Sequence, residues 1–348
     1  MIISNLKALE GLLWGVALGD GMCRMHRFRQ PPFLLHSAVG TWFLAVFQSA
    51  LGFGELALKL EILAAPSRAK AFRGTTNSLA STLQEVARGH PTHQLLADAL
   101  PCWMPICFGP QDEEEFLNKL IEWVHVTHWH PRVISAAALL VGSMRAMLVD
   151  TGISLEGQLE QGERLADKVL HLLFDRKEAD TPQAIWQAHQ ALKYHVAVAK
   201  GALEPSVLQV PSGFDGRDSP EQLVVYALAL TEQRSSPEED LCLVSERCGS
   251  SDILRPLVSG LAGFRQGVLA LPEAPLQKLW ARDLWHRHLS TLAYRDPYFP
   301  CLVEAEIELS GQEVAALKEL DHFCDLPQAK NQLTLFENQT KETMNGTF

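Results

Sequence analysis

The chain of 348 residues lacks any closely spaced pair of cysteines. Its seven cysteines form no Cys-x-x-Cys motif and are odd in number. A disulfide-stabilised secreted domain needs paired cysteines, so this usage is typical of free thiols in a reducing compartment. We therefore expect a cytoplasmic protein without a disulfide framework.

Charged residues are scarce, at 20% of the chain, whereas hydrophobic residues make up 47%. This balance excludes a globally disordered chain and supplies apolar surface for a large core. The net charge of −11 argues against a protein that coats nucleic acid. The longest apolar segment, residues 133–149, contains Arg145 and follows Arg132. Its length and charges predict a buried helix, not a membrane span.

Several common catalytic motifs are also missing. The sequence has neither the glycine-rich loop of the P-loop type nor that of the dinucleotide type, and no Gly-x-Ser-x-Gly. Alternating polar and apolar positions, which indicate strands, are weak and confined to residues 302–309. The sequence therefore gives no motif of the usual nucleotide-binding or serine-hydrolase sites.

Helical periodicity extends along most of the chain. Ser4 is a suitable N-cap for a first helix, which we expect to end in the turn Gly19-Asp20-Gly21, and Ser37 for a second helix. Further helices are predicted near residues 55–65, 75–88, 112–125, 131–149, 155–174, 180–200, 220–232, 237–247, 252–270 and 273–290. The predicted fold class is all-α, with one large helical domain over residues 1–300.

The composition changes after residue 300. Residues 301–348 contain nine acidic residues and three lysines. We interpret residues 301–327 as an acidic extension and the polar residues 328–348 as a disordered tail.

Three segments occur in an order that is informative. They are Gly15-Val16-Ala17-Leu18-Gly19-Asp20-Gly21, then Thr127-His128-Trp129-His130-Pro131-Arg132-Val133-Ile134, then residues 249–256 continuing into Ser259-Gly260-Leu261-Ala262-Gly263. Together with Met104-Pro105-Ile106, this set resembles the ADP-ribosylglycohydrolase family over about residues 6–290. The resemblance implies an all-α fold and a dinuclear magnesium site that positions water to cleave an ADP-ribosyl bond.

The chain departs from the metal-binding motifs of that family. The resemblance implies ligands from Thr-Asp-Asp-Thr at the start of the second helix, where this chain has Ala38-Val39-Gly40-Thr41. It also implies ligands from Gly-Asp-x-Asp-Thr near the last long helices, where residues 249–253 retain only Asp252. One carboxylate does not neutralise two divalent cations. We therefore expect no cofactor, and magnesium only if an altered site keeps Asp252 as a ligand.

Loss of carboxylates next to the basic residues Arg24, His26 and Arg27 favours an anion over a cation. Our leading hypothesis is a metal-free protein that binds an ADP-ribose-like ligand or an ADP-ribosylated target. The other expected ligand-binding residues are Thr41, His128, Ser250 and Ser251. The alternative for the basic segment is a solvated surface turn beside a vestigial site.

Two other functional classes remain open from the sequence. An active hydrolase with rearranged ligands would use Asp252 and Asp20 as catalytic residues. The alternative for Asp20, which we favour, is a structural carboxylate that binds backbone N–H groups at a helix end. The third class is a purely structural interaction protein.

The histidines of the middle segment have two interpretations. His125, His128 and His130 are spaced closely enough for a zinc site, although no cysteine or carboxylate accompanies them. The alternative is packing, with Thr127 as an N-cap before Pro131.

The tail contains Gln332-Leu333-Thr334-Leu335-Phe336, which resembles the peptide by which bacterial proteins bind the DNA sliding clamp. Gln332, Leu333, Leu335 and Phe336 would be the partner-binding residues, because a short apolar peptide in a polar tail is suited to a preformed groove. The alternative is that these side chains pack back onto the domain.

Overall fold

The computed structural model describes residues 5–25, 34, 38–51, 92–93, 95, 97–176, 182–201, 219–232, 253–279 and 282–294. Within these ranges the chain is helical, and extended pairing is limited to two isolated bridges. The predicted all-α fold class is confirmed. In chain order the elements are α1 (Leu6–Met25), α2 (Ala38–Ala50), α6 (Leu100–Trp103), η2 (Met104–Phe108), α7 (Glu113–His125), α8 (Pro131–Val149), α9 (Leu155–Arg176), α10 (Pro182–Gly201), α11 (Pro220–Glu232), α13 (Leu254–Gln266), η4 (Val268–Ala270), α14 (Glu273–Gln277) and α15 (Arg282–Tyr294).

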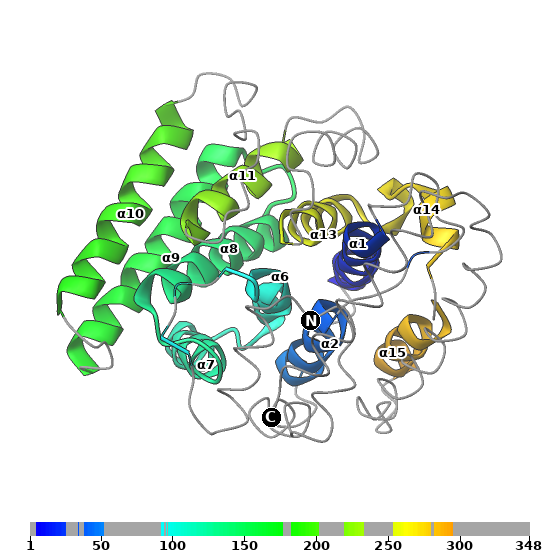
Figure 1. Ribbon diagram of the computed structural model, residues 1–348, viewed down its shortest axis with the longest axis horizontal. Helices are drawn as coiled ribbons and strands as arrows, with labels where there is room; N and C mark the ends of the chain where they lie inside the picture. Colours follow the sequence, from blue (N-terminus) through cyan, green and yellow to red (C-terminus); the bar gives the residue numbers. More distant parts are fainter. Residues whose placement is uncertain are drawn as a thin grey trace, which may run out of the picture.

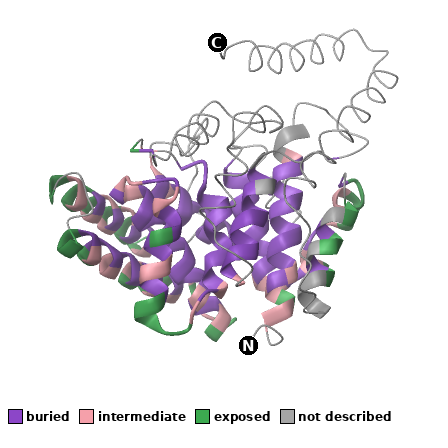
Figure 2. Cartoon of the chain, turned by 90° about the horizontal axis from the view of Figure 1, so that it is seen from below, coloured by how far each residue is buried: buried purple, intermediate pink, exposed green. Residues whose placement is uncertain are grey.

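The helices lie in two groups that meet at the centre of the molecule (Figure 1). Helices α8, α9, α10 and α11 form one side, and α1, α2, α13 and α15 form the other. Buried residues occupy the central helices in both groups, whereas exposed residues gather at the two edges (Figure 2).

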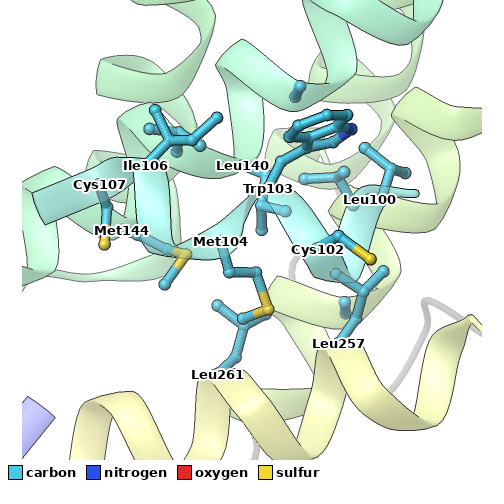
Figure 3. Packing of buried hydrophobic residues seen from close by; sticks show 14 of the residues in the cluster. Leu100, Cys102, Trp103, Met104, Ile106, Cys107, Leu140, Met144, Leu257 and Leu261 are labelled. Atoms are coloured by element: carbon cyan, nitrogen blue, oxygen red, sulfur yellow. The ribbon is translucent and has the colours of Figure 1, made fainter. Parts of the chain in front are cut away.

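The short buried segment α6–η2 joins the two groups. Its side chains Trp103 and Met104 lie between α8 and α13, and Met104 points toward Leu261 of α13 (Figure 3). A Cβ atom on Gly260 of α13 would lie 3.0 Å from Cε of Met104. This segment was not predicted as helical, because a stretch that is buried on every side has no amphipathic period.

Helices α1 and α13 pack against each other at backbone distance, although they are more than two hundred residues apart. Glycines at four-residue intervals in α1 allow this approach: a Cβ on Gly15 would lie 2.2 Å from the carbonyl oxygen of Ser259. From the side of α13, a Cβ on Gly263 would lie 2.0 Å from the carbonyl oxygen of Gly11 in α1. The glycines of the first and third sequence segments therefore form one helix–helix contact.

Helix α8 is the central helix of its group. It is long and apolar enough to cross a membrane by length and composition, but 72% of the relevant window is buried inside the protein. Gly142 allows close contact with α9, and the hydroxyl of Ser143 donates a hydrogen bond to the carbonyl oxygen of Gln158 at 2.9 Å. These features are those of a core helix, as the sequence predicted.

Three helix boundaries differ from the predictions. The helix predicted over 252–270 ends at Gln266, because Gly267 has a φ of 85° and is followed only by the short helix η4. Helix α1 does not end at residues 19–21 but continues to Met25, because Gly19 serves the contact with α13 and not a helix end. The helix predicted over 273–290 is divided into α14 and α15. Between these two helices, the backbone carbonyl oxygen of Lys278 accepts a hydrogen bond from the backbone N–H of Leu34 at 2.7 Å. The next residue, Leu279, forms an isolated parallel β-bridge with Leu34.

The other predicted helices fall into two sets. Those predicted over 112–125, 131–149, 155–174, 180–200 and 220–232 match α7 to α11 to within two residues at each end. The helices predicted at 55–65, 75–88 and 237–247, and the strand candidate at 302–309, lie outside the described residues.

Candidate functional site

The start of α2 is the position at which the family resemblance places a metal-binding motif. Gly40 faces the carboxylate of Asp20 from α1 and the indole of Trp285 from α15. A Cβ on Gly40 would lie 3.1 Å from Oδ2 of Asp20, 3.3 Å from Cζ2 of Trp285 and 3.5 Å from Cη2 of Trp285. Trp285 is 1% exposed and Asp20 is 2% exposed. The indole therefore fills the space that a longer side chain at residue 40 would occupy.

This arrangement does not fit a dinuclear magnesium centre of the usual kind. Magnesium requires oxygen ligands in near-octahedral geometry. Neither Val39 nor Gly40 has a side-chain oxygen, and the ring of Trp285 offers carbon atoms in their place. Within the described ranges, no three His, Cys, Asp or Glu side chains are grouped as a metal site. Asp252, the expected metal ligand, lies outside them.

A buried thiol lies next to the start of α2. Cys102 of α6 donates a weak hydrogen bond to the carbonyl oxygen of Val39, with Sγ 3.6 Å from the oxygen. Burial raises the pKa of the Cys102 thiol well above its ordinary value, and the charges of Asp20 and Asp98 raise it further. A fully buried thiol that stays protonated is not a nucleophile. Cys102 is therefore a packing residue beside two acidic groups.

Asp20 occupies a different position from the one predicted. It lies inside α1, which continues for another turn, so it is not a carboxylate at a helix end. Its Oδ2 atom faces Gly40 across the α1–α2 contact. Asp20 thus belongs to the same buried group as Gly40, Trp285 and Cys102.

His128 lies in the short connection between α7 and α8. Its backbone N–H donates to the carbonyl of Val124 at 2.8 Å. Thr92 forms a β-bridge with His128: the N–H of Thr92 donates to the carbonyl of Thr127, and the N–H of Trp129 donates to the carbonyl of Thr92. Its Nδ1 atom is 2.9 Å from the hydroxyl oxygen of Thr127, which in turn donates to the Val124 carbonyl at 3.3 Å. The direction of the contact between Nδ1 and Thr127 follows the tautomer of the ring, because the hydroxyl can donate either to Nδ1 or to the Val124 carbonyl.

The opposite ring nitrogen of His128, Nε2, is enclosed and has no hydrogen-bond partner among the described residues. The residue is 1% exposed. Burial, followed by the charge of His130, lowers the pKa of His128 to about 3. The imidazole is therefore neutral at physiological pH.

The three histidines of this segment do not converge on a metal ion. The ring of His125 stacks on Trp129, with centroids 4.5 Å apart and planes inclined by 10°. His130, and not Thr127 as predicted, is the N-cap of α8: its Nδ1 accepts a hydrogen bond from the backbone N–H of Arg132 at 3.2 Å. Thr127 instead closes the end of α7. The three rings therefore have separate structural roles.

Arg132 forms a pair that the sequence analysis missed. Its guanidinium donates to both carboxylate oxygens of Glu221 in α11, Nε at 3.0 Å and Nη2 at 2.8 Å. The side chain of Glu221 is fully buried, and burial raises its pKa although Arg132 acts in the opposite direction. A separation of 89 residues leaves no local signal for this pair.

The remaining predicted site residues are only partly described. The backbones of Arg24 and Thr41 belong to α1 and α2, but their side chains lie outside the description. The predicted residues outside the described ranges altogether are His26, Arg27, Ser250, Ser251, Asp252, Gln332, Leu333, Leu335 and Phe336.

Two of the surface hollows in the described part of the chain are lined by charged residues and include none of Asp20, Gly40 and His128. One, of about 460 Å³, is lined by residues of α7, among them His125, together with Val126 and Arg176. The other, of about 330 Å³, lies over charged residues of α9 and Lys193 of α10. The buried group at Gly40 is therefore separate from both.

Comparison with known proteins supplies the family. A family model described as ADP-ribosylglycohydrolase matches residues 6–299. No curated protein matches the chain. Because the matched region spans most of the sequence and the helical fold agrees with it, the chain belongs to the ADP-ribosylglycohydrolase family.

Proposed function

We propose that this family member does not hydrolyse ADP-ribosyl bonds by a two-magnesium mechanism and instead binds an ADP-ribose-like ligand, free or attached to a target, without metal. The observation that carries this proposal is the indole of Trp285 against Gly40. At the position where the family resemblance implies carboxylate ligands, the protein has a glycine covered by a buried ring.

The charges near α2 support the same conclusion. Each divalent cation needs several oxygen ligands and a compensating negative charge. The carboxylate of Asp20 remains, but Val39 and Gly40 contribute neither charge nor oxygen from their side chains. An acidic cradle for two magnesium ions is not provided by these residues.

His128 supports a ligand with hydroxyl groups. Although His128 is 1% exposed and lines neither surface hollow, its Nε2 is a buried polar atom that a ribose hydroxyl would satisfy once a ligand opened this position. Since its pKa is about 3, it is not a cation for phosphate at neutral pH. The phosphate groups would be bound by Arg24, His26 and Arg27, the basic residues that follow Asp20 in the sequence.

Calorimetry with ADP-ribose tests the proposal on the full chain. We expect saturable binding that is unchanged by a chelator and by added magnesium, and weakened at least about tenfold by His128→Phe, the loss expected when a hydrogen bond in a buried site is removed. Binding that requires magnesium would contradict the proposal. Release of ADP-ribose from a modified substrate, dependent on magnesium and abolished by Asp252→Asn, would establish the alternative of an active hydrolase that uses Asp252 and Asp20. Absence of both binding and release would favour the structural class.

We also propose that Gln332, Leu333, Leu335 and Phe336 bind a bacterial sliding clamp, which agrees with a cytoplasmic location. Free, buried cysteines such as Cys102 are consistent with that compartment. A peptide of this length orders on binding, so affinity on the order of micromolar is expected. Capture of the clamp by the full chain should be lost in a chain ending at Leu326. Recovery untouched by the double change Leu335→Ala and Phe336→Ala would reject this proposal.

A further inference from the structure

Helix α10 lies at the outer edge of its group of helices and packs on α8, α9 and α11 (Figure 1). Four of its 20 residues are buried, namely Ala188, Leu192, Val196 and Ala199, and Ile185 packs partly against the core. In the central helix α8, by comparison, fifteen of 19 residues are buried. Two of the four buried side chains of α10 are single methyl groups, which remove little apolar surface from water. Apolar packing therefore holds α10 less strongly than it holds α8.

A network of ion pairs joins α10 to α9. The ammonium of Lys193 lies 2.9 Å from Oε1 of Glu163 and 2.6 Å from Oδ2 of Asp167. The ammonium of Lys200 lies 3.0 Å from Oε2 of Glu163. Nε2 of His189 lies 3.4 Å from Oδ1 of Asp167. Both carboxylates belong to α9 and all three basic groups belong to α10, so the network fastens one helix to the other.

The network is partly enclosed, which strengthens its pairs. The side chain of Glu163 is 17% exposed, and those of Asp167 and Lys200 are each 25% exposed. Burial alone would raise the pKa of Glu163, but hydrogen bonds from Lys193 and Lys200 outweigh burial and hold this pKa below its ordinary value. Burial alone would lower the pKa of Lys193, but hydrogen bonds from Asp167 and Glu163 raise it above its ordinary value. The packed position of α10 favours the charged form of both groups, so by linkage these charges favour that position.

The sequence of α10 offers no other ionic attachment. Its only acidic or basic residues, apart from its histidines, are Lys193 and Lys200. Burial, followed by the charge of Arg132, lowers the pKa of the second histidine, His195, so this residue adds no ionic attraction. The electrostatic attachment of α10 therefore depends on the network with α9.

The neighbouring contact between α8 and α9 is of a different kind. A Cβ on Gly142 of α8 would lie 2.9 Å from Cα of Gly162 of α9. Packing of this kind does not depend on charge, whereas ion pairs that reach the surface are screened as the ionic strength rises. Salt should therefore weaken the contact between α9 and α10 and spare the contact between α8 and α9.

We infer that α10 is a detachable helix, which leaves the fold when salt screens its ion pairs with α9 while the rest of the chain stays folded. Its release uncovers the parts of α8 and α9 on which it lies. Folded proteins open locally in units that are less stable than the core, and an element with few buried side chains is such a unit. The inference is independent of the proposed ligand, because α10 contributes no residue to the group at Gly40.

Amide hydrogen exchange of the full chain, followed by mass spectrometry at about 0.05 M and about 1 M KCl, tests the inference. We expect the amides of α10 to exchange at least about threefold faster at the higher concentration, because each pair contributes little alone but the pairs act together. The amides of α8, measured in the same chain, should exchange at one slow rate at both concentrations. Exchange of α10 as slow as that of α8, or unaffected by KCl, would overturn the inference.

A substitution at residue 193 tests the network itself. Lys193→Met removes the ammonium that Glu163 and Asp167 share, so the amides of α10 should exchange at least about fivefold faster at low salt and respond less to KCl. The matched control is Lys168→Met. Lys168 lines the same surface hollow of α9 but pairs with Glu113 of α7 at 2.6 Å. This variant loses the same charge and should keep the wild-type exchange of α10. Equal effects of the two variants would show that the charge of the surface, and not the network, holds α10, and would contradict the inference.

Discussion

The space next to Gly40 shows how a single residue in one helix depends on a distant one. The loss of carboxylates at residues 39 and 40 is visible in the sequence, because the family motif aligns with Ala38-Val39-Gly40-Thr41. The role of Trp285 is not visible, since it depends on how α15 packs against α1 and α2. The aromatic contact of Trp14 with His286, with ring centroids 5.0 Å apart, belongs to the same packing of α15.

Substitution of Gly40 tests whether this space is filled. Gly40→Asn should lower the free energy of unfolding by about 1–3 kcal/mol through overpacking against Trp285. Gly40→Asp has nearly the same shape but adds a buried charge beside Asp20, and should cost about 2 kcal/mol more. Urea denaturation at neutral pH measures both. Equal stability of the two variants would show that residue 40 is hydrated and not enclosed.

The pH dependence of stability tests the neutral state of His128. An unfolded histidine titrates near 6.5, whereas burial lowers the pKa of His128 to about 3 and that of His125 to about 4. At a pH between the unfolded pKa and the folded pKa of each histidine, the unfolded chain binds a proton that the folded chain does not. The free energy of unfolding therefore falls as the pH falls through this range. The loss is about 1.4 kcal/mol per pH unit for each histidine.

His128→Gln should remove one such contribution between pH 6.5 and pH 4, because glutamine does not titrate. The control for the substitution itself is His171→Gln at an exposed position of α9, where the change should alter the free energy of unfolding by less than about 0.5 kcal/mol at neutral pH. Urea midpoints at several pH values provide the measurement. Full wild-type dependence in His128→Gln would mean that His128 is protonated in the folded chain.

At the scale of elements, sequence periodicity predicted α7 to α11 because each has enough residues to show a helical pattern. Helix α7 also begins with a clear signal, since the side chain of Asp112 accepts a hydrogen bond from the backbone N–H of Glu115. The break between α14 and α15 was not predicted. It depends on a bridge with Leu34, which no local pattern reports.

The contact between α1 and α13 gives the sequence segments a structural meaning. Gly15→Ala should destabilise the protein by about 3 kcal/mol or more, because the new Cβ meets backbone atoms of Ser259 and the helices must separate. Gly201→Ala is the control, since a Cβ at the end of α10 meets nothing within 4 Å. Thermal unfolding followed by circular dichroism compares them. A Gly15→Ala variant as stable as Gly201→Ala would contradict the close contact.

At the scale of the whole molecule, the helical fold of the family is retained while the position of its expected metal ligands is filled. The core extends from α1 and α13 through α6–η2 to α8 (Figures 2 and 3). The family and the fold class followed from ordered sequence segments and periodicity. That Trp285 fills the space next to Gly40 could not be predicted from the sequence, because it depends on the packing of α15, which brings residue 285 to residue 40.

Titration of the full chain with Mn²⁺, followed by electron paramagnetic resonance, tests the central claim most directly. Mn²⁺ prefers the same oxygen ligands as magnesium and loses its free-ion signal when it is bound. The account predicts that the free-ion signal rises in proportion to added Mn²⁺, with no saturable uptake by the protein. Saturable uptake of a pair of ions per chain, lost in Asp252→Asn, would contradict it.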